Sequence, residues 1–399
     1  MINGGEREHP FFEPDEYTAI NTRYFAEMRR TGRVVIDPSG WIETLSDAAN
    51  VALPPFGKLP LDRYYMDEGD ALGAVRSSLH LLLEAWDGAT FDPTRFTACP
   101  SVGIASLLTM AILRRRGTRR VVFETPCYFA AILQAEWLGY EVVLTPTYRS
   151  NGYRRPPDYE RPVRNLPSVW WLTHPRVTLG FDQETEALQR LIQTVEREDY
   201  VVVDEALDQS FPSRFGALHH VWSEAKRLIR LKGFGKPLGL NGYRLAFVLH
   251  AAELRADMVD CLETFAGAID AHSLEAACAV ATEPGHFRAM MHTAKQQVVA
   301  LRAAAERVAA GSGVVVNPLV NGYLGSAVVD LEALGSDQAT RRHQFLLGCQ
   351  RHGMPVIIGP SMHFASDPPT EAVRLNFFSK REHILQGIAT LAEVASVLT

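Results

Sequence analysis

Short apolar runs alternate with longer amphipathic stretches through the middle of this 399-residue chain. Most of these runs show no alternation of apolar and polar positions, which is typical of strands buried on both faces of a parallel sheet. They are Val121–Phe123, Glu141–Pro146, Val169–His174, Tyr200–Asp204, Leu228–Gly233 and Leu245–His250. Helical patterns at Gly103–Arg115, Phe129–Leu138 and Gln183–Val195 separate them. The alternation predicts an α/β fold with helices on both faces of one sheet.

The C-terminal third has a different pattern. Long helical stretches dominate it, and two β-like pieces interrupt them, which predicts a second, α+β unit. The helical stretches are Ala251–Ala266, Glu275–Gly311 with breaks near Pro284, Asp337–His352 and Lys380–Leu398; the β-like pieces are Gly322–Val329 and Pro355–Ile358. The N-terminal segment is irregular and rich in Pro and Gly, and we expect it to pack on that unit. We therefore divide the chain at residues 1–60, 61–280 and 281–399.

Composition narrows the class of protein. The chain has 40 basic and 46 acidic residues, a formal charge of −6, and no basic stripe, which argues against a nucleic-acid-binding protein. Its five cysteines show no CxxC spacing, so we expect buried thiols and no metal site. The polar N-terminus does not resemble a signal peptide, and no apolar run approaches the ~20 residues that span a bilayer. We therefore expect a cytoplasmic protein without a membrane partner.

The most informative stretch is Leu231–Arg244, LKGFGKPLGLNGYR, in which Lys236 lies in a glycine-dense loop directly after an apolar strand. Glycines allow a backbone to approach a ligand closely. A P-loop is excluded because Pro237 follows the lysine where Ser or Thr is needed, and the glycine spacing does not fit a dinucleotide fingerprint. Taken alone, the lysine is better interpreted as a surface residue in a flexible turn.

A second candidate lies upstream in Tyr200–Ala206, YVVVDEA. Asp204 ends a buried strand, and α/β sheets bind their ligands at the carboxyl ends of the strands. The alternative interpretation is a helix N-cap or a turn residue.

Together these two stretches resemble the class I/II aminotransferase family, which comprises enzymes of fold type I that use pyridoxal 5'-phosphate (PLP). Other segments resemble the family in the same order along the chain. They are ACPSVGIA (Ala98–Ala105), TPCY (Thr125–Tyr128), THPRVTLG (Thr173–Gly180) and AVRLNF (Ala372–Phe377). The resemblance covers about residues 60–399. It implies a large PLP-binding domain with a mostly parallel seven-stranded sheet covered by helices. A smaller α+β domain would come from the N- and C-terminal segments.

The resemblance implies a role for each matching residue. Lys236 would form a Schiff base with PLP and then act as general base. Asp204 would keep the pyridine nitrogen protonated, and Tyr128 would stack on the ring. The phosphate would be held by the backbone N–H groups at the start of a helix, by a guanidinium and by a tyrosine of the neighbouring subunit in a homodimer. These phosphate ligands are Ser101, Val102, Gly103, Arg244 and Tyr64 (or its neighbour Tyr65).

Three residues are predicted to contact the substrate. Arg374 would bind the α-carboxylate of an amino acid through two parallel hydrogen bonds. Gly40 lies in the tract 34–41, VVIDPSGW, which corresponds to a pocket-lining segment of the family. His174 ends a predicted strand, and its alternative interpretation is a structural histidine with satisfied hydrogen bonds.

The sequence departs from the family pattern where donors to the phenolic oxygen of PLP are expected. Val177 replaces the asparagine of NPTG, and Leu207 replaces the tyrosine of DEAY. Gly233 stands for the first serine of SFSK, another phosphate contact. Either Thr173, His174 or Thr178 substitutes, or the enzyme does not depend on this tuning. Without the donors, the cofactor Schiff base should keep its proton to higher pH.

We predict a PLP-dependent transformation of an L-amino acid or amino-acid conjugate through an external aldimine and a Cα carbanion. Transamination in specialised metabolism is the leading interpretation. The alternative is a diverged lyase or decarboxylase that performs elimination, cyclisation or oxidative decarboxylation on a biosynthetic intermediate. A non-catalytic PLP-binding regulator is a remote alternative, because Lys236, Asp204 and Arg374 are all present.

Overall fold

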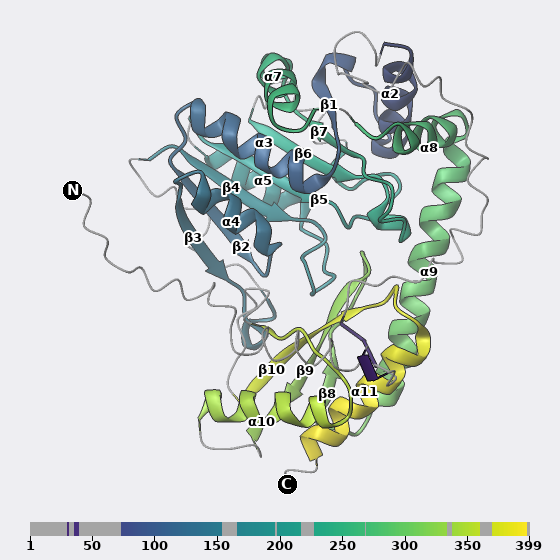
Figure 1. The fold of residues 1–399 in the computed structure, drawn as a ribbon. Helices are drawn as coiled ribbons and strands as arrows, with labels where there is room; N and C mark the ends of the chain where they lie inside the picture. Colours follow the sequence, from purple (N-terminus) through teal and green to yellow (C-terminus); the bar gives the residue numbers. More distant parts are fainter. Residues whose placement is uncertain are drawn as a thin grey trace.

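The computed structural model describes residues 30–31, 36–39, 73–153, 166–195, 198–216, 227–267, 269–332, 337–359 and 369–396. Two sheets organise these residues, one above the other in Figure 1. We call the seven-stranded sheet with helices α2 to α8 the large domain, and the three-stranded sheet with helices α10 and α11 the small domain. The division of the chain at residues 60 and 280 stays a prediction.

The seven-stranded sheet has the order β1-β7-β6-β5-β4-β2-β3. Only β7 runs antiparallel to its neighbours, so the predicted mostly parallel sheet is confirmed. The strands are β1 (Phe96–Cys99), β2 (Arg120–Thr125), β3 (Glu141–Pro146), β4 (Ser168–Thr173), β5 (Tyr200–Glu205), β6 (Leu228–Gly233) and β7 (Ala246–Leu249). Strands β3 and β6 have the predicted bounds, and the other predicted strands are shifted by one or two residues. Strand β1 was not predicted.

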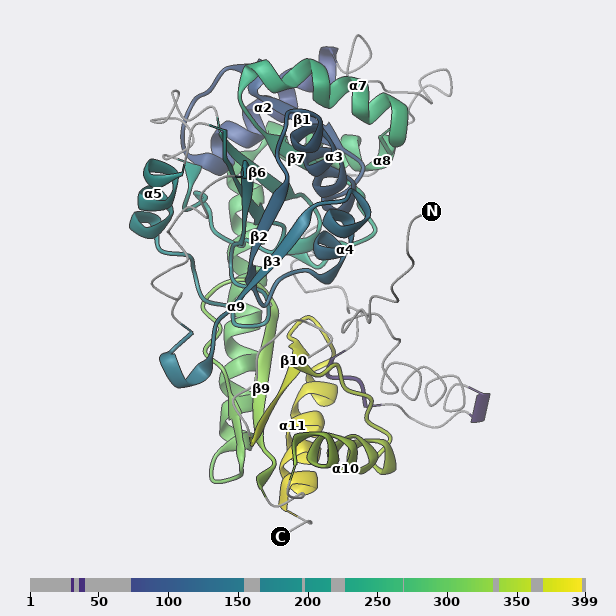
Figure 2. The same ribbon diagram turned by 90° about the vertical axis from the view of Figure 1, so that its left-hand side faces the viewer.

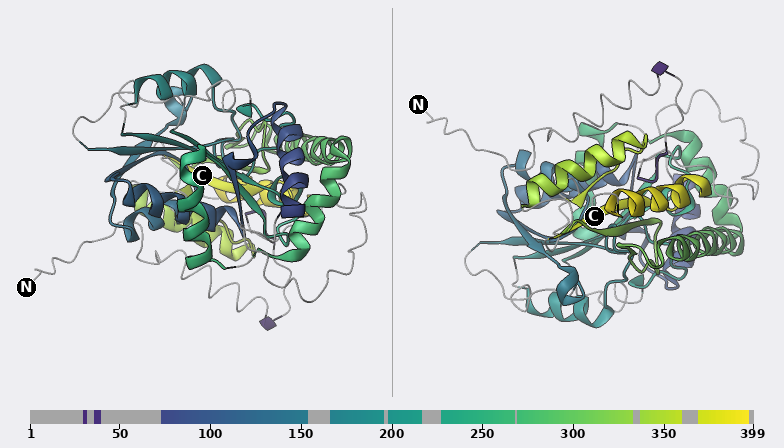
Figure 3. Two further views of the ribbon diagram at one scale, coloured as in Figure 1. Left: turned by 90° about the horizontal axis from the view of Figure 1, so that it is seen from above. Right: turned by 90° about the horizontal axis from the view of Figure 1, so that it is seen from below.

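Helices cover both faces of this sheet, which lies between two layers in Figure 3. One face packs against α3 (Val102–Arg115), α4 (Phe129–Trp137) and α7 (Arg255–Phe265). The other packs against α5 (Thr185–Thr194) near β4 and β5. Beside β1 and β7, that second face packs against α2 (Gly73–Asp87), α8 (Ala271–Thr282) and the start of α9 (Pro284–Ala309). Both faces are mostly apolar, which explains the long hydrophobic runs in the sequence.

The small domain has the strand order β10-β9-β8, and both pairings are antiparallel. Helix α9 runs from the large domain to this sheet (Figure 2). The elements are β8 (Val314–Val316), β9 (Leu324–Asp330), α10 (Gln338–Arg351), β10 (Thr370–Asn376) and α11 (Arg381–Ser396). A break at Pro284 is confirmed, but Pro355–Ile358 is not a strand, because only Ile358 forms a bridge, to Val373. The described ranges also contain the 3-10 turns η3 (Pro93–Arg95), η4 (Arg149–Asn151), η6 (Lys236–Leu238) and η7 (Ala252–Leu254).

The carboxyl ends of the parallel strands meet at the edge of the large sheet that faces the small domain (Figure 1). Thr173 and Asp204 are paired there at the ends of β4 and β5, and Gly233 ends β6. A short piece of the N-terminal segment packs on the small domain, since Ile36 joins its hydrophobic core and the carbonyl of Pro38 accepts from Asn376 N–H at 2.8 Å. The fold therefore brings the sequence motifs to one edge between two sheets.

All five cysteines are free thiols, and four of them are buried. In the described ranges, no three His, Cys, Asp or Glu side chains are grouped so that they could hold a metal ion. Likewise, no helix in this part of the chain is both long enough and apolar enough to cross a membrane.

His250 makes the stability of the large domain sensitive to acid. Its ring is buried, with Nδ1 2.8 Å from the carbonyl of Ala251 and Nε2 2.9 Å from the hydroxyl of Thr97. Because a carbonyl only accepts, Nδ1 carries the proton and Nε2 accepts from Thr97. Burial lowers the pKa of His250 from 6.5 to about 4. The unfolded chain therefore binds a proton that the native protein excludes between these values, and stability falls as pH drops from 6.5 to 4.

We expect this single group to contribute up to about 3 kcal/mol to that loss. In His250→Asn, the unfolding free energy measured by urea titration should depend less on pH between 6.5 and 4 than in the unmodified protein. Equal slopes for both proteins would contradict the assignment.

Candidate active site

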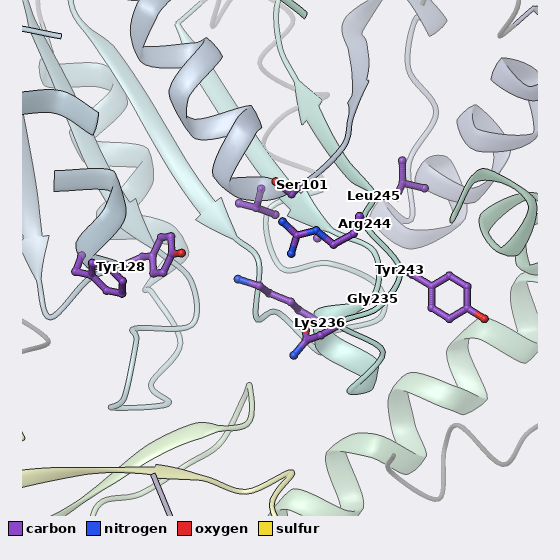
Figure 4. A pocket seen from close by; sticks show the side chains of 11 residues that line it. Ser101, Tyr128, Gly235, Lys236, Tyr243, Arg244 and Leu245 are labelled. Atoms are coloured by element: carbon purple, nitrogen blue, oxygen red, sulfur yellow. The ribbon is translucent and has the colours of Figure 1, made fainter. Parts of the chain in front are cut away.

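A cavity of about 370 Å³ lies where β1, β2 and β6 end. Five residues predicted from the sequence, Ser101, Val102, Tyr128, Lys236 and Arg244, lie along its wall. The remaining lining residues are Phe129, Gly233, Gly235, Asn241, Tyr243 and Leu245. Figure 4 shows Lys236 and Arg244 extending into the space between Ser101 and Tyr128, whereas the Tyr243 ring points away from them toward α9.

Lys236 opens the 3-10 turn η6, directly after β6. The turn closes at Gly239, whose φ of +71° is in the left-handed region that favours glycine. Its hydrogen bond from Gly239 N–H to the Lys236 carbonyl measures 3.1 Å. The Lys236 Nζ lies over the face of Tyr128, 5.3 Å from the ring centroid. The glycine-rich motif therefore forms a tight turn that presents the lysine to an aromatic wall.

Asp204 lies behind this pair at the end of β5, on the face of the sheet that carries α3 and α4. Burial raises the pKa of its carboxyl, while the Ala206 N–H, which donates to Oδ1 at 3.0 Å, and the Lys236 ammonium act against that rise. Burial and the Asp204 charge also raise the pKa of Tyr128, and Arg244 opposes them. Asp204, Lys236, Tyr128 and Arg244 thus form one electrostatic group.

The N-terminus of α3 provides a site for an anion. Ser101 caps this helix, since its Oγ accepts from Ile104 N–H at 3.2 Å. The first turn holds no acidic residue, so its backbone N–H groups and the helix dipole favour a negative charge. Arg244 adds a guanidinium from the opposite wall, and its own backbone N–H donates to Ser273 Oγ at 2.8 Å. This part of the cavity can hold a phosphate.

Gly235 allows the lysine turn to pack against the following loop. A Cβ at this position would lie 2.3 Å from the Leu240 carbonyl oxygen and 3.1 Å from that of Tyr243. We expect Gly235→Ala to displace this loop, to destabilise the protein by about 1–3 kcal/mol and to weaken PLP binding at least about tenfold.

Gly242 provides the matched control in the same loop, because a Cβ there would meet nothing within 4 Å. Gly242→Ala should leave the PLP dissociation constant and the thermal midpoint close to those of the unmodified protein. Absorbance titration measures the dissociation constant, and calorimetry measures the thermal midpoint. Equal effects of the two variants would show that crowding at Gly235 does not cause the loss of PLP binding.

The positions that depart from the family pattern are apolar here and packed. Leu207 belongs to the hydrophobic core of the small domain, and Val177 packs against it. At Gly233 a Cβ would lie 3.2 Å from both the Ala206 carbonyl oxygen and a methyl group of Val102, so a larger residue is crowded. Neither Val177 nor Leu207 offers a side-chain donor. Thr173 is a polar candidate at this edge, and its buried hydroxyl has no hydrogen-bond partner among the described residues.

Arg374 is buried in β10 of the small domain. Its Nε donates to the Ser39 carbonyl at 2.9 Å, its Nη2 donates to the same oxygen, and Ser39 Oγ donates to the Arg374 carbonyl at 2.5 Å. The N-terminal segment therefore fixes the direction of this guanidinium. Arg374 is not part of the cavity lining, and its predicted contact with a carboxylate stays a prediction.

His174 is fully buried and does not line the cavity. Its Nδ1 accepts from Gln183 N–H at 3.2 Å, so the neutral ring carries its proton on Nε2, which lies 3.6 Å from Asp208 Oδ1. Its backbone N–H donates to the Asp204 carbonyl at 2.8 Å. Nε2 itself has no hydrogen-bond partner among the described residues, so both the structural interpretation and a substrate contact stay predictions.

The remaining predicted residues are divided between two groups. Gly103 lies in the first turn of α3, next to the cavity, and a Cβ there would meet only Ser101 Oγ, at 3.8 Å. Tyr64 and Gly40 lie outside the described residues. Sequence reasoning missed Phe129, which directly follows the TPCY motif, and Asn241, which lies within the lysine motif, because neither side chain by itself indicates chemistry.

Comparisons with known proteins agree with this architecture. Residues 71–320 match the family described as Aminotransferase class I and II. Histidinol-phosphate aminotransferase of Deinococcus radiodurans is 26% identical over 216 residues, which are 52% of this chain and 54% of that protein. The chain thus matches about half the length of this curated relative.

Solved structures with the same fold match nearly the whole chain. An aspartate aminotransferase from Thermus thermophilus with maleate has a TM-score of 0.77 at 16% identity, covering 96% of this chain and 97% of that one. YbdL from Escherichia coli, for which a methionine aminotransferase function is described, has a TM-score of 0.71 at 18% identity, covering 95% and 98%. At these identities the likeness shows the fold.

The fold and the site define an α/β enzyme of fold type I with a lysine at the carboxyl edge of its sheet. The chain belongs to the class I and II aminotransferase family. Members of this family use PLP, the cofactor predicted from the motifs.

Proposed function

We propose that this protein is an aminotransferase that binds PLP at Lys236 and moves the amino group of an L-amino acid or amino-acid conjugate. One observation carries the proposal: Lys236, Tyr128 and Arg244 line one cavity at the N-terminus of α3, with the Asp204 carboxyl buried behind them. The wall offers an amine, an aromatic face and an anion site, which are the three features that a phosphorylated pyridine aldehyde requires. The residues present therefore fit the cofactor.

Each residue has a role that follows from its surroundings. The α3 N–H groups at Val102 and Gly103 and the Arg244 guanidinium would hold the phosphate, and Ser101 caps the helix. Tyr128 would pack on the ring, and its pKa, raised by burial, keeps the hydroxyl neutral. Asp204 accepts a hydrogen bond from Ala206 and would balance a protonated ring nitrogen.

Lys236 has the proton-transfer role. When bound, PLP supplies an aldehyde for the substrate amine and a ring that accepts electrons from the substrate Cα. The flexible Lys236 side chain then takes and returns a proton at Nζ, within reach of the Tyr128 face. Arg374 would bind the substrate carboxylate, with Ser39 holding the guanidinium in a fixed direction.

The apolar residues Val177 and Leu207 favour a second candidate, a lyase or decarboxylase of specialised metabolism. Both belong to the hydrophobic packing of the small domain, so neither donates a hydrogen bond to a phenolic oxygen. Without those donors, the Schiff base of the cofactor would keep its proton to a higher pH than in a family member that has them. A homodimer with the site at the subunit interface is part of both candidates.

A product assay with purified protein tests the proposal. PLP is added, the visible absorbance is recorded, and amino acids are then titrated while keto acid, ammonia and carbon dioxide are measured. Transamination predicts one keto acid per amino donor and loss of the visible band in the absence of an acceptor keto acid. Ammonia or carbon dioxide with a persistent band would instead indicate the lyase or decarboxylase, and no band at all would contradict both.

A further inference from the structure

A buried side-chain amide connects to the turn that carries Lys236. Gln209, in the loop after β5, is 2% exposed, and its Nε2 donates to the Pro237 carbonyl at 2.8 Å. Pro237 directly follows Lys236 within the turn η6. Because a carbonyl oxygen can only accept, the amide nitrogen must face it, and the orientation of Gln209 is fixed. Gln209 therefore holds the lysine turn from a different loop.

Gln209 is itself held by the small domain. Asn321 lies in the loop between β8 and β9 and is 1% exposed. Its Oδ1 accepts from Gln209 N–H at 2.9 Å and from Gly322 N–H at 2.8 Å. Its backbone N–H donates to the carbonyl of Gly180, in the loop after β4, at 3.2 Å. One residue of the small domain thus joins two loops of the large domain.

The amide nitrogen of Asn321 completes these contacts. Nδ2 lies 2.8 Å from Asp182 Oδ1, 2.8 Å from Asp208 Oδ1 and 3.0 Å from Ser210 Oγ. Since both ends of the amide are hydrogen-bonded in a buried setting, any displacement of Asn321 leaves polar groups unpaired, which disfavours intermediate positions.

We propose that Asn321 and Gln209 form a relay that couples the docking of the small domain to the position of Lys236, and that both are positioning residues for the reaction. The relay runs from the β8–β9 loop through the Asn321 amide, the backbone and side chain of Gln209, and the Pro237 carbonyl. The inference rests on the proposed function, in which Lys236 is the group that binds PLP.

Two variants interrupt the relay at different links. Gln209→Met keeps the length of the side chain and removes the bond to Pro237, and Asn321→Ala removes the contacts to Gln209. The readouts are the PLP dissociation constant and the rate at which the visible band forms on cofactor-free protein, beside the thermal midpoint. We expect each single variant to weaken PLP binding about tenfold.

The double variant distinguishes a relay from two independent contacts. In a relay the second substitution adds little, so Gln209→Met/Asn321→Ala should bind PLP about as weakly as either single variant. Effects that multiply to about a hundredfold would overturn the proposal. So would single variants with unchanged PLP binding while the unmodified protein binds PLP. If the unmodified protein forms no band, the proposed function itself fails.

Asn317→Ala is the matched control, because Asn317 is also a buried asparagine before β9. Its Nδ2 donates to Ser326 Oγ at 2.8 Å and to Tyr153 Oη at 3.1 Å, away from the lysine turn. This variant should lower the thermal midpoint without changing PLP binding. If Asn317→Ala lost as much PLP affinity as Asn321→Ala, the effect of Asn321 would be explained by a general loss of stability, and the relay would be contradicted.

Hydrogen exchange tests the relay without any substitution. If docking of the small domain favours the PLP-binding position of Lys236, then PLP binding must in turn stabilise the contacts of the relay, because coupling between two sites is reciprocal. The amides of Gln209 and Gly322, both bonded to Asn321, should exchange several-fold more slowly with PLP than without it. The Asn317 amide, which donates to the Ser326 carbonyl at 2.9 Å, should change less. Equal protection at all three amides would contradict the proposal.

Discussion

Lys236→Ala is expected to remove the visible band that forms with PLP and to lower kcat for an amino donor by at least about 10⁴-fold. Lys236 is the only lysine in the cavity wall described here. Its removal takes away both the amine that binds the aldehyde and the base that moves the proton, and the two losses act on successive steps. Phosphate, ring and carboxylate contacts remain, so the variant should still bind PLP, but more weakly.

The control is Lys380→Ala, since Lys380 is exposed and precedes helix α11. It should retain the band and its turnover. Absorbance spectra and initial rates measured at saturating PLP compare the two variants. A band of normal intensity in Lys236→Ala would mean that another amine binds the aldehyde, and the assignment of the cavity would then be wrong. Partial recovery of the rate with an added small primary amine would support a role in proton transfer.

Most strands of the large sheet were predictable because they are largely apolar runs, although β6 also carries the buried Arg230 and Lys232. Strands β3 and β6 begin and end where the pattern changes, and Asp204 follows from its place after such a run. Strand β1 was missed because it has only four residues, one of them the polar Thr97, and only Pro100 separates it from the helix cap Ser101. Strand β8 consists of three valines, which favour a strand, but three residues are too few to show a period, and its pairing with β9 defines it.

In the site too, residues in short local motifs were predictable from the sequence, whereas contacts between distant parts of the chain were not. Lys236, Tyr128, Ser101 and Arg244 lie in short motifs whose order along the chain indicated the family, and the fold brings all four to one cavity. The contact between Gln209 and Asn321 joins residues 112 positions apart. Each residue in isolation resembles an ordinary polar loop residue, so only the packing of the two domains reveals their connection.

The face of the sheet opposite the cavity carries a buried charge cluster, defined by Asp87, Glu205, Arg230 and Lys232. All four side chains are fully buried. Arg230 lies 2.7 Å from Asp87 and 2.5 Å from Glu205, and Lys232 lies 2.9 and 3.2 Å from the same two carboxylates. Burial alone would raise the pKa of Glu205, but Arg230 and Lys232 lower it overall. Two positive charges thus balance two negative charges directly behind Asp204.

Arg230→Met should therefore destabilise the protein by about 3–5 kcal/mol, because two buried carboxylates then share Lys232 and one negative charge is left uncompensated. That is a large part of the 5–15 kcal/mol typical of folded proteins. The control is Arg116→Met, which breaks a pair of similar length, 2.8 Å to Asp257, whose side chains are 32% and 33% exposed. The control should cost less than about 1 kcal/mol. Urea unfolding at a fixed PLP concentration measures both, since bound cofactor adds stability.

At acidic pH, the difference in unfolding free energy between Arg230→Met and the unmodified protein should become smaller. Because the pKa of Glu205 is lowered in the native state, its stabilising contribution is present above pH 4.5 and is lost as pH falls below that value. In the variant, one of the two buried carboxylates that share Lys232 takes up a proton more readily, which relieves part of the destabilisation. The stability difference should thus be largest near pH 7 and smaller near pH 4.5. A difference that stays constant with pH would instead attribute the loss to packing around the methionine, with no part for the uncompensated charge.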